Sequence, residues 1–224
     1  MLRKLFTIIG ASLFLFAAVA VAHEGYHYAG ITNTAGTARS THAAITHREN
    51  PSCSWCHTLE WVVLWDSNAS DQFAEAGVGY SSWWSTPRRF AHLWYATPNG
   101  SEATGVTVGK VPLGTPVTVA VSKNADQTAT ITWSWQECKR NNSCSPKQIV
   151  KTVAVPGWTD QDGIHPTKME VYSSDGSHPS ACADFANVAI YPDDVNASLQ
   201  NTDPYYVTPG STLENFSVRY NCSS

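Results

Sequence analysis

The clearest structural signal in this chain is a strict alternation of side-chain character over residues 117–135. Valine recurs at every second position of residues 117–121, and a polar connection at 123–126 follows. In the return run, 128–135, threonine and serine take one set of alternate positions and apolar residues take the other. Because successive side chains of a strand point to opposite faces of a sheet, this pattern predicts a β-hairpin with one buried and one solvent-facing side.

Most of the remaining chain consists of short runs of β-branched and aromatic residues that are separated by turn residues. Residues 61–65 are apolar at every position, which is typical of a central strand that is buried on both faces. Further strands are expected at 73–80, 89–95, 149–155, 168–172, 184–191 and 215–220. Turns are expected at Pro156-Gly157, Asp162-Gly163 and Pro209-Gly210. The chain shows no helical period and no long linker, so we predict a single all-β domain, either a sandwich or a barrel.

The N-terminus has the three parts of a secretory signal peptide. Met1-Leu2-Arg3-Lys4 is basic, residues 5–21 are apolar, and Ala20-Val21-Ala22 offers a small-residue cleavage site. The alternative is a membrane anchor, because the apolar run is near the lower limit for spanning a bilayer. We expect residues 1–22 to be removed and the protein to be secreted. Residues 23–51 are then expected to form an irregular or partly extended arm, and residues 52–224 the β-sandwich domain.

Six cysteines follow the predicted signal peptide, an even number that indicates three disulfides in an exported chain. The short spacings favour Cys53–Cys56 and Cys138–Cys144. Cys182–Cys222 would then be the long-range disulfide.

The charge of the chain argues against a nucleic-acid partner. The net charge is −4 and only 14% of the residues are charged, so no basic surface is expected. We also expect no membrane association after signal cleavage, and a monomer.

One motif matches the attachment signature of c-type haem. Cys53-Ser54-Trp55-Cys56-His57 has the form C-x-x-C-H. However, it leads into a predicted strand, and Met169 is the single methionine beyond the start that can serve as a distal ligand. The alternative is a small disulfide loop that precedes a histidine.

His23 offers two further metal hypotheses. As a mature N-terminal residue it can chelate copper, with a second imidazole from His27, His42, His47 or His92. Residues 23–27 also match H-E-x-x-H, which binds zinc only when both imidazoles lie on one face of a helix. No helical period surrounds them. We therefore assign no metal and no cofactor.

Several strand segments share short motifs with one peptidase family. Residues 61–66, Trp-Val-Val-Leu-Trp-Asp, are similar to a W-V-G-I-D-G segment, and residues 73–80 follow where that family has Q-T-G-V. The aromatic run 92–95 comes next. Residues 168–172 are similar to an A-E-W-I-V strand, and residues 183–188 to an A-D-F-G-x-V strand. Over residues 60–191 the chain thus resembles the glutamic peptidases (eqolisins). The resemblance implies a concanavalin-like antiparallel β-sandwich of the jelly-roll type and acid endopeptidase activity.

The resemblance also implies two catalytic positions. Glu170 falls where the family places its catalytic glutamate, which activates water. Glu75 falls where the family places a glutamine, whose amide donates a hydrogen bond to the oxyanion. A carboxyl group can donate such a bond only when it is protonated, so we expect Glu75 and Glu170 to share a proton at low pH. The alternative is that both glutamates are ordinary exposed strand residues.

Nine tryptophans suggest a second class of function. Exposed aromatic rings stack on sugars, so the same groove is expected to hold either a peptide or a glycan. Most of these rings should lie in the core. We expect Trp65, Trp83, Trp84 and Trp94 to contact the substrate. The alternative to hydrolysis is therefore a non-catalytic glycan- or surface-binding module.

Overall fold

The computed structural model describes most of the chain after residue 25. The described residues are 26–32, 38–51, 56–66, 72–82, 88–97, 106–109, 111–139, 143–158, 163–164, 167–173, 179–191, 197–201 and 204–223. The predicted signal peptide lies outside these residues.

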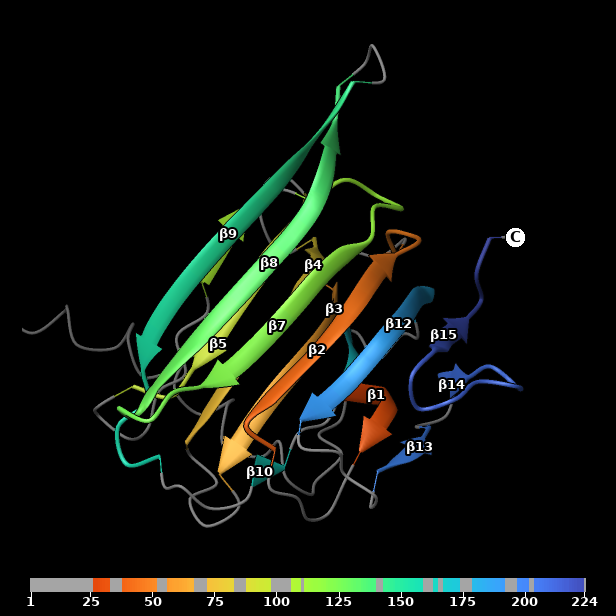
Figure 1. Cartoon of the computed structure of the whole chain (residues 1–224). Coiled ribbons are helices and arrows are strands. Elements are labelled where there is room, and N and C mark those ends of the chain that lie inside the picture. Colours follow the sequence, from red (N-terminus) through yellow and green to blue (C-terminus); the bar gives the residue numbers. More distant parts are fainter. Residues whose placement is uncertain are drawn as a thin grey trace, which may run out of the picture.

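Two antiparallel sheets pack face to face (Figure 1). Sheet A has, in spatial order, β13 (Ser198–Gln200), β1 (Tyr26–Thr32), β11 (Thr167–Ser173), β3 (Cys56–Asp66), β4 (Phe73–Ser81), β5 (Arg88–Tyr95) and β6 (Val106–Gly109), with β10 (Gly163–Ile164) also paired to β3. Sheet B has β14 (Tyr206–Val207), β15 (Phe216–Tyr220), β12 (Ala181–Tyr191), β2 (Ser40–His47), β7 (Val117–Lys123), β8 (Thr128–Cys138) and β9 (Cys144–Ala154). The predicted all-β sandwich is confirmed.

The main core lies between the two sheets, and the predicted hairpin supplies much of it. β7 pairs with β8, and the apolar face of β8 is buried at Ala129, Ile131, Trp133 and Trp135. The Trp133 indole donates a hydrogen bond of 3.1 Å to the carbonyl oxygen of Gly77 on β4, which joins the sheets directly. Sheet A contributes Val62, Leu64, Ala76, Val78 and Leu93 from the central strands.

Sheet A is also apolar on its other face, as the uninterrupted run at 61–65 predicts. Leu59, Trp61, Val63 and Phe90 form a second buried cluster there, separate from the main core. Val63 is fully buried although it points away from sheet B. We call this side the outer face of sheet A. Its central apolar side chains are each less than a tenth exposed.

The N-terminal arm expected at 23–51 needs a correction. Residues 26–32 and 40–47 form β1 and β2, which lie inside the two sheets (Figure 1). β1 pairs with β11 and β13, and β2 pairs with β7 and β12. These partners are distant in sequence, so small residues such as Ala29 and Ala43 become core residues through long-range pairing.

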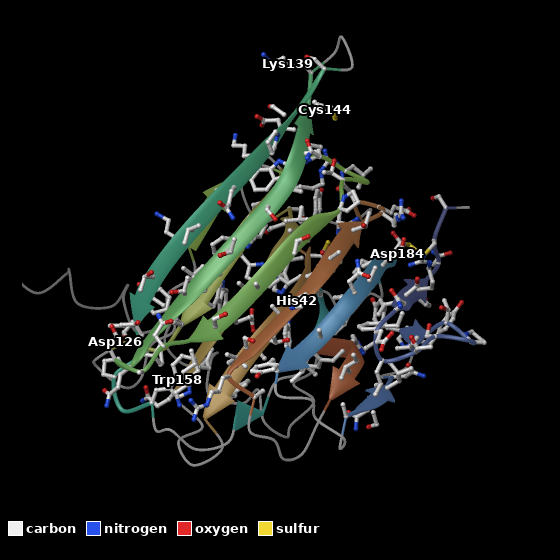
Figure 2. The ribbon with its side chains drawn as sticks, in the orientation of Figure 1. His42, Asp126, Lys139, Cys144, Trp158 and Asp184 are labelled. Carbon is white, nitrogen blue, oxygen red and sulfur yellow. A yellow bond between two sulfur atoms is a disulfide. The ribbon has the colours of Figure 1, made fainter. Side chains whose placement is uncertain are left out.

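β8 and β9 form the longest hairpin, which extends beyond the neighbouring strands (Figure 1). Lys139 and Cys144 lie near its far end and Asp126 at the other (Figure 2). The disulfide Cys138–Cys144 closes the far end, as predicted.

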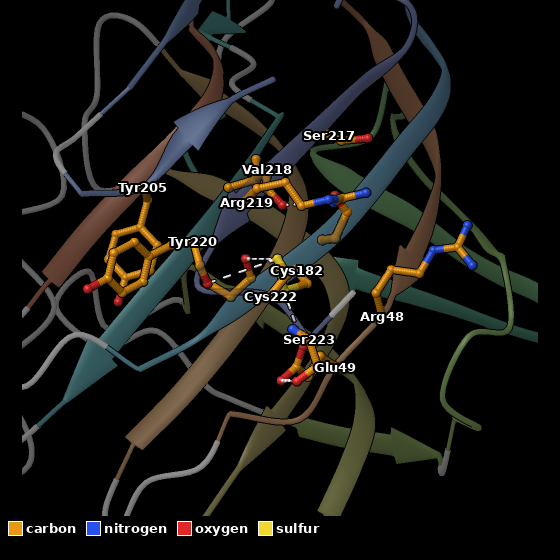
Figure 3. The surroundings of a disulfide bond; sticks show 12 residues. Arg48, Glu49, Cys182, Tyr205, Ser217, Val218, Arg219, Tyr220, Cys222 and Ser223 are labelled. Carbon is orange, nitrogen blue, oxygen red and sulfur yellow. Dashed lines mark hydrogen bonds between the residues drawn. A yellow bond between two sulfur atoms is a disulfide. The ribbon is translucent and has the colours of Figure 1, made fainter. Parts of the chain in front are cut away.

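The predicted Cys182–Cys222 disulfide is also present, with its Cα atoms 5.9 Å apart (Figure 3). It fastens the chain after β15 to the start of β12. Glu49 accepts hydrogen bonds from the backbone and hydroxyl of Ser223 beside it, at 2.8 and 2.9 Å. Cys56 is disulfide-bonded, while Cys53 lies outside the described residues.

An ionic cluster holds the same edge of sheet B together. The Asp184 carboxylate accepts hydrogen bonds from Arg219, from Ser217 at 2.7 Å and from Arg48 at 2.5 Å. Burial acts to raise the pKa of Asp184, but these hydrogen bonds and the charge of Arg219 outweigh it and hold the pKa below its usual value. The cluster joins β12 and β15 to the residue that follows β2.

Among the described residues, no helix is long and apolar enough to cross a membrane.

Candidate functional site

Strand register determines which side chains share the outer face of sheet A. Residues directly opposite one another on neighbouring strands point to the same side. Two of the rows that cross β3, β4 and β5 on this face are Trp61–Gly77–His92 and Val63–Glu75–Trp94. Glu75 therefore lies on the middle one of these three strands, and the neighbouring row contains His92.

Glu75 contacts His92 across the strands. The His92 Nε2 atom lies 3.1 Å from Glu75 Oε1, and the two side chains are 1% and 14% exposed. Gly77, directly opposite His92, leaves the space that the ring occupies, since a Cβ atom there would lie 2.6 Å from His92 Cε1. The contact thus depends on the small size of Gly77 and on the diagonal placement of Glu75 on β4 and His92 on β5.

Three of the described neighbours of this pair on the outer face are apolar. Trp61, Val63 and Phe90 are each less than a tenth exposed on the same face. The Phe90 ring lies against the His92 ring with centroids 6.2 Å apart, edge to face. In a water-poor environment the attraction between a carboxylate and an imidazolium is stronger than in water.

Glu170 lies on β11, opposite Leu59 on β3 and Tyr28 on β1. Its position belongs to the outer face, as does that of Glu75. The two positions are two strands apart and four residues apart along the strands, which places their Cα atoms about 16 Å apart in a flat sheet. The shared proton stays a prediction, because the Glu170 side chain lies outside the described side chains.

Two of the predicted substrate-binding tryptophans lie on this face. Trp94 is opposite Glu75, and Trp65 packs against Phe73 with ring centroids 5.2 Å apart. Both indoles are partly exposed. Trp83 and Trp84 lie outside the described residues.

A second carboxylate–imidazole pair lies between the sheets. His47 Nδ1 is 3.0 Å from Glu60 Oε1, and the side chains are 3% and 0% exposed. Within the described part of the chain, His47 Nε2, Glu60 Oε2 and the Thr58 hydroxyl have no hydrogen-bond partner. This pair is closed off from solvent, so it bears on stability rather than on binding.

The metal and haem alternatives gain no support. The sulfur of Cys56 is in a disulfide, so it cannot form a thioether to haem. His27 lies on strand β1, whereas H-E-x-x-H needs a helix. His23 lies outside the described residues. No cluster of three His, Cys, Asp or Glu side chains with metal-site spacing occurs among the side chains that the structure describes.

Comparison with solved structures identifies the fold. Scytalido-glutamic peptidase with a transition state analog inhibitor superposes with a TM-score of 0.59 and 12% identity, over 88% of this chain and 98% of that one. The chain has the fold of the glutamic peptidases. The same enzyme with a peptide-based transition state analog gives a TM-score of 0.55 at 11% identity, over 88% and 98% of the two chains. SCP-B, a member of the eqolisin family in complex with the tripeptide Ala-Ile-His, gives 0.53 at 12%, over the same shares.

No family model matches the sequence, and no curated protein matches it. The likeness to glutamic peptidases is therefore one of fold.

Within this glutamic-peptidase fold, the sequence did not reveal the contact between Glu75 and His92. His92 entered only as one of several possible copper ligands. The available signal was Gly77, two residues after Glu75, because a glycine within a strand marks a close approach of another group. To infer the His92 contact from Gly77, one would also need the register between β4 and β5, and no local sequence pattern specifies that register.

Proposed function

We propose that this chain is a hydrolase that cleaves peptide bonds on the outer face of sheet A, with Glu75 and Glu170 as its acid–base groups. The observation that carries the proposal is the Glu75 carboxyl group, which lies beside a buried apolar cluster in a fold shared with glutamic peptidases. Solved proteins with this fold hold a peptide-based transition state analog or a tripeptide, which supports peptides as the substrate class.

Peptide hydrolysis needs two functions near the scissile bond. A base takes a proton from the attacking water, and a donor stabilises the carbonyl oxygen or protonates the leaving amine. Glu75 and Glu170 are thus proposed to act on different atoms of one bound peptide.

Digestion of a denatured protein mixture from strongly acidic to neutral pH tests the proposal. The mature, oxidised chain is compared with Glu170→Gln and with Glu137→Gln, which changes an exposed glutamate on sheet B. We expect cleavage by the wild type and by Glu137→Gln, and a loss of at least about a hundredfold in Glu170→Gln, the usual contribution of a general acid or base. Absence of cleavage by folded wild-type protein would overturn the proposal.

A second candidate function is glycan binding without cleavage. It is supported by the partly exposed indoles of Trp65 and Trp94, which flank Glu75 on one face. Trp83 and Trp84 remain proposed contacts. Binding to a glycan array that Trp94→Ala abolishes, together with no peptide cleavage at any pH, would favour this candidate.

We also propose that the protein is exported. The two described disulfides support this, because disulfides persist mainly in oxidising compartments. N-terminal sequencing of the protein recovered from the medium is expected to begin at His23. Recovery of the intact N-terminus from the cytosol would contradict export.

A further inference from the structure

We infer that His92 is a positioning residue that keeps Glu75 ionised, so that Glu75 accepts the proton of the attacking water and retains this function further into the acid range. The catalytic part of this inference rests on the proposed function. The coupling between the two side chains does not, and it can be measured in an inactive protein.

The geometry of the pair favours a positioning role for the imidazole. His92 is 1% exposed and reaches Glu75 at 3.1 Å, while Glu75 retains 14% exposure. The imidazole therefore lies behind the carboxylate, and the carboxylate is the more accessible of the two groups. The ring is held tightly, because even a methyl group on Gly77 would lie 2.6 Å from His92 Cε1. Such a ring orients the carboxylate without itself meeting a substrate.

The proton between the two groups belongs to the imidazole. A free glutamic acid loses its proton near pH 4.3 and a free imidazolium near pH 6.5, about two pH units later. A single proton between the two groups is therefore held by the imidazole and leaves the carboxyl ionised. Apolar neighbours such as Trp61 and Phe90 strengthen the attraction between the resulting charges.

Strand register shows where the other titratable positions of the outer face lie relative to Glu75. Glu75 is the sole titratable residue at the outward positions of β4, and the sequence of β6 contains none. Other titratable residues at outward register positions occupy different rows or distant strands, namely Arg88 on β5, His57 on β3, Lys168, Glu170 and Tyr172 on β11, and Tyr26 and Tyr28 on β1. The row spacing places Arg88 and His57 about 13 Å along the strands from His92. The inference rests on the contact of Glu75 with His92 at 3.1 Å.

This assignment separates Glu75 from the glutamine that the eqolisin resemblance places at its position. A glutamine amide donates a hydrogen bond, whereas an ionised carboxylate only accepts. A donor carboxyl would have to be protonated and would lose its function as the pH rises. An ionised Glu75 retains its function as a base over the same range.

Histidine NMR tests the coupling directly. The full mature chain, labelled at histidine, is titrated as wild type and as Glu75→Gln, with exposed His42 on sheet B as the internal reference (Figure 2). Because a carboxylate stabilises an imidazolium, the midpoint of the His92 titration should fall by about one pH unit or more in Glu75→Gln, and that of His42 should not move. If Glu75→Gln does not fold, Glu75→Asp is used, with a smaller fall expected. An unchanged His92 midpoint in the folded variant would overturn the inference.

The pH profile of peptide cleavage tests the catalytic part. His92→Gln keeps an N–H donor but cannot carry a charge, so the acid limb of kcat/KM should move to higher pH by about one unit. The plateau should stay within a few-fold of the wild type. His42→Gln is the matched control and should match the wild type throughout. A uniform loss at every pH with an unmoved limb would show that His92 is merely structural and would overturn the inference.

A third variant separates this inference from the proposed function. If Glu75 is the base, Glu75→Gln is inactive at every pH. Cleavage retained by Glu75→Gln but lost in Glu170→Gln would overturn the role of Glu75 as the base and leave the hydrolase proposal standing. No cleavage by the wild type would overturn the proposed function, while the NMR titration would still decide the coupling.

Discussion

The buried pair of His47 and Glu60 gives the sharpest stability prediction. Replacing Glu60 with leucine leaves the His47 imidazole in the interior without its partner at 3.0 Å, and both side chains are at most 3% exposed. Removal of one member of a buried pair costs about 3–5 kcal/mol. Replacing both members with leucine removes the desolvated groups together and is expected to cost about 1 kcal/mol or less. The double variant should therefore be more stable than either single variant.

The assay is urea unfolding at neutral pH with the disulfides intact, followed by tryptophan fluorescence. The four proteins of the cycle are the wild type, His47→Leu, Glu60→Leu and the double variant. A typical domain has about 5–15 kcal/mol of stability, so the loss in each single variant is a large part of it and the urea midpoint should fall clearly. Single variants that each cost less than about 1 kcal/mol, or costs that simply add in the double variant, would refute the reasoning.

Three further predictions concern the scaffold. Asp184→Asn should lower stability at neutral pH by about 1 kcal/mol. The native pKa of Asp184 is lowered, so its contribution is present above the unfolded value of about 3.9 and is lost as the pH falls through the native value. Urea midpoints of wild type and variant should thus converge in acid, and a constant difference would contradict this. Gly77→Ala should cost about 3 kcal/mol, because its Cβ atom would meet a backbone oxygen at 1.9 Å. Gly114→Ala, where the new Cβ meets nothing but φ is +71°, should cost about 1 kcal/mol in the same assay, and equal costs would refute the steric argument. Replacing Cys182 and Cys222 with serine should cost about 4 kcal/mol, since the disulfide closes a separation of 40 residues. A loss below about 1 kcal/mol would contradict it.

The local pattern predicted the sandwich because each strand carries its own periodicity. The alternation over 128–135 correctly places Ala129, Ile131 and Trp133 in the core. The uninterrupted apolar run at 61–65 correctly predicts a strand that is covered on both sides. Such patterns depend only on side chains two residues apart, so they can be recognised without knowledge of the fold.

The N-terminal strands could not be predicted in the same way. β1 is buried through Ala29 and Ile31 and pairs with β11, more than a hundred residues later. Residues 23–51 are rich in threonine, alanine, glycine and histidine, which give a weak local signal. Their strand structure arises from the partners that the fold supplies.

For the candidate site, too, the sequence predicted some features, and others depend on long-range strand pairing. The sequence singled out Glu75, Trp65 and Trp94, and the structure places all three on one face. The contact of Glu75 with His92 depends on the register of β4 and β5. A shift of one residue would send His92 to the opposite face. For this reason the site was predictable as a set of residues but not as an arrangement.

Peptides are proposed to bind and react on the outer face of sheet A, and the predictions on peptide cleavage depend on this location. The most direct test is a crystal structure of the mature chain with a peptide-based transition state analogue. We expect the analogue to lie on this face, with its tetrahedral centre within hydrogen-bond reach of the Glu75 carboxylate and its side chains against Trp94. An analogue that fails to bind at saturating concentration, or that binds elsewhere on the molecule, would contradict the proposed location.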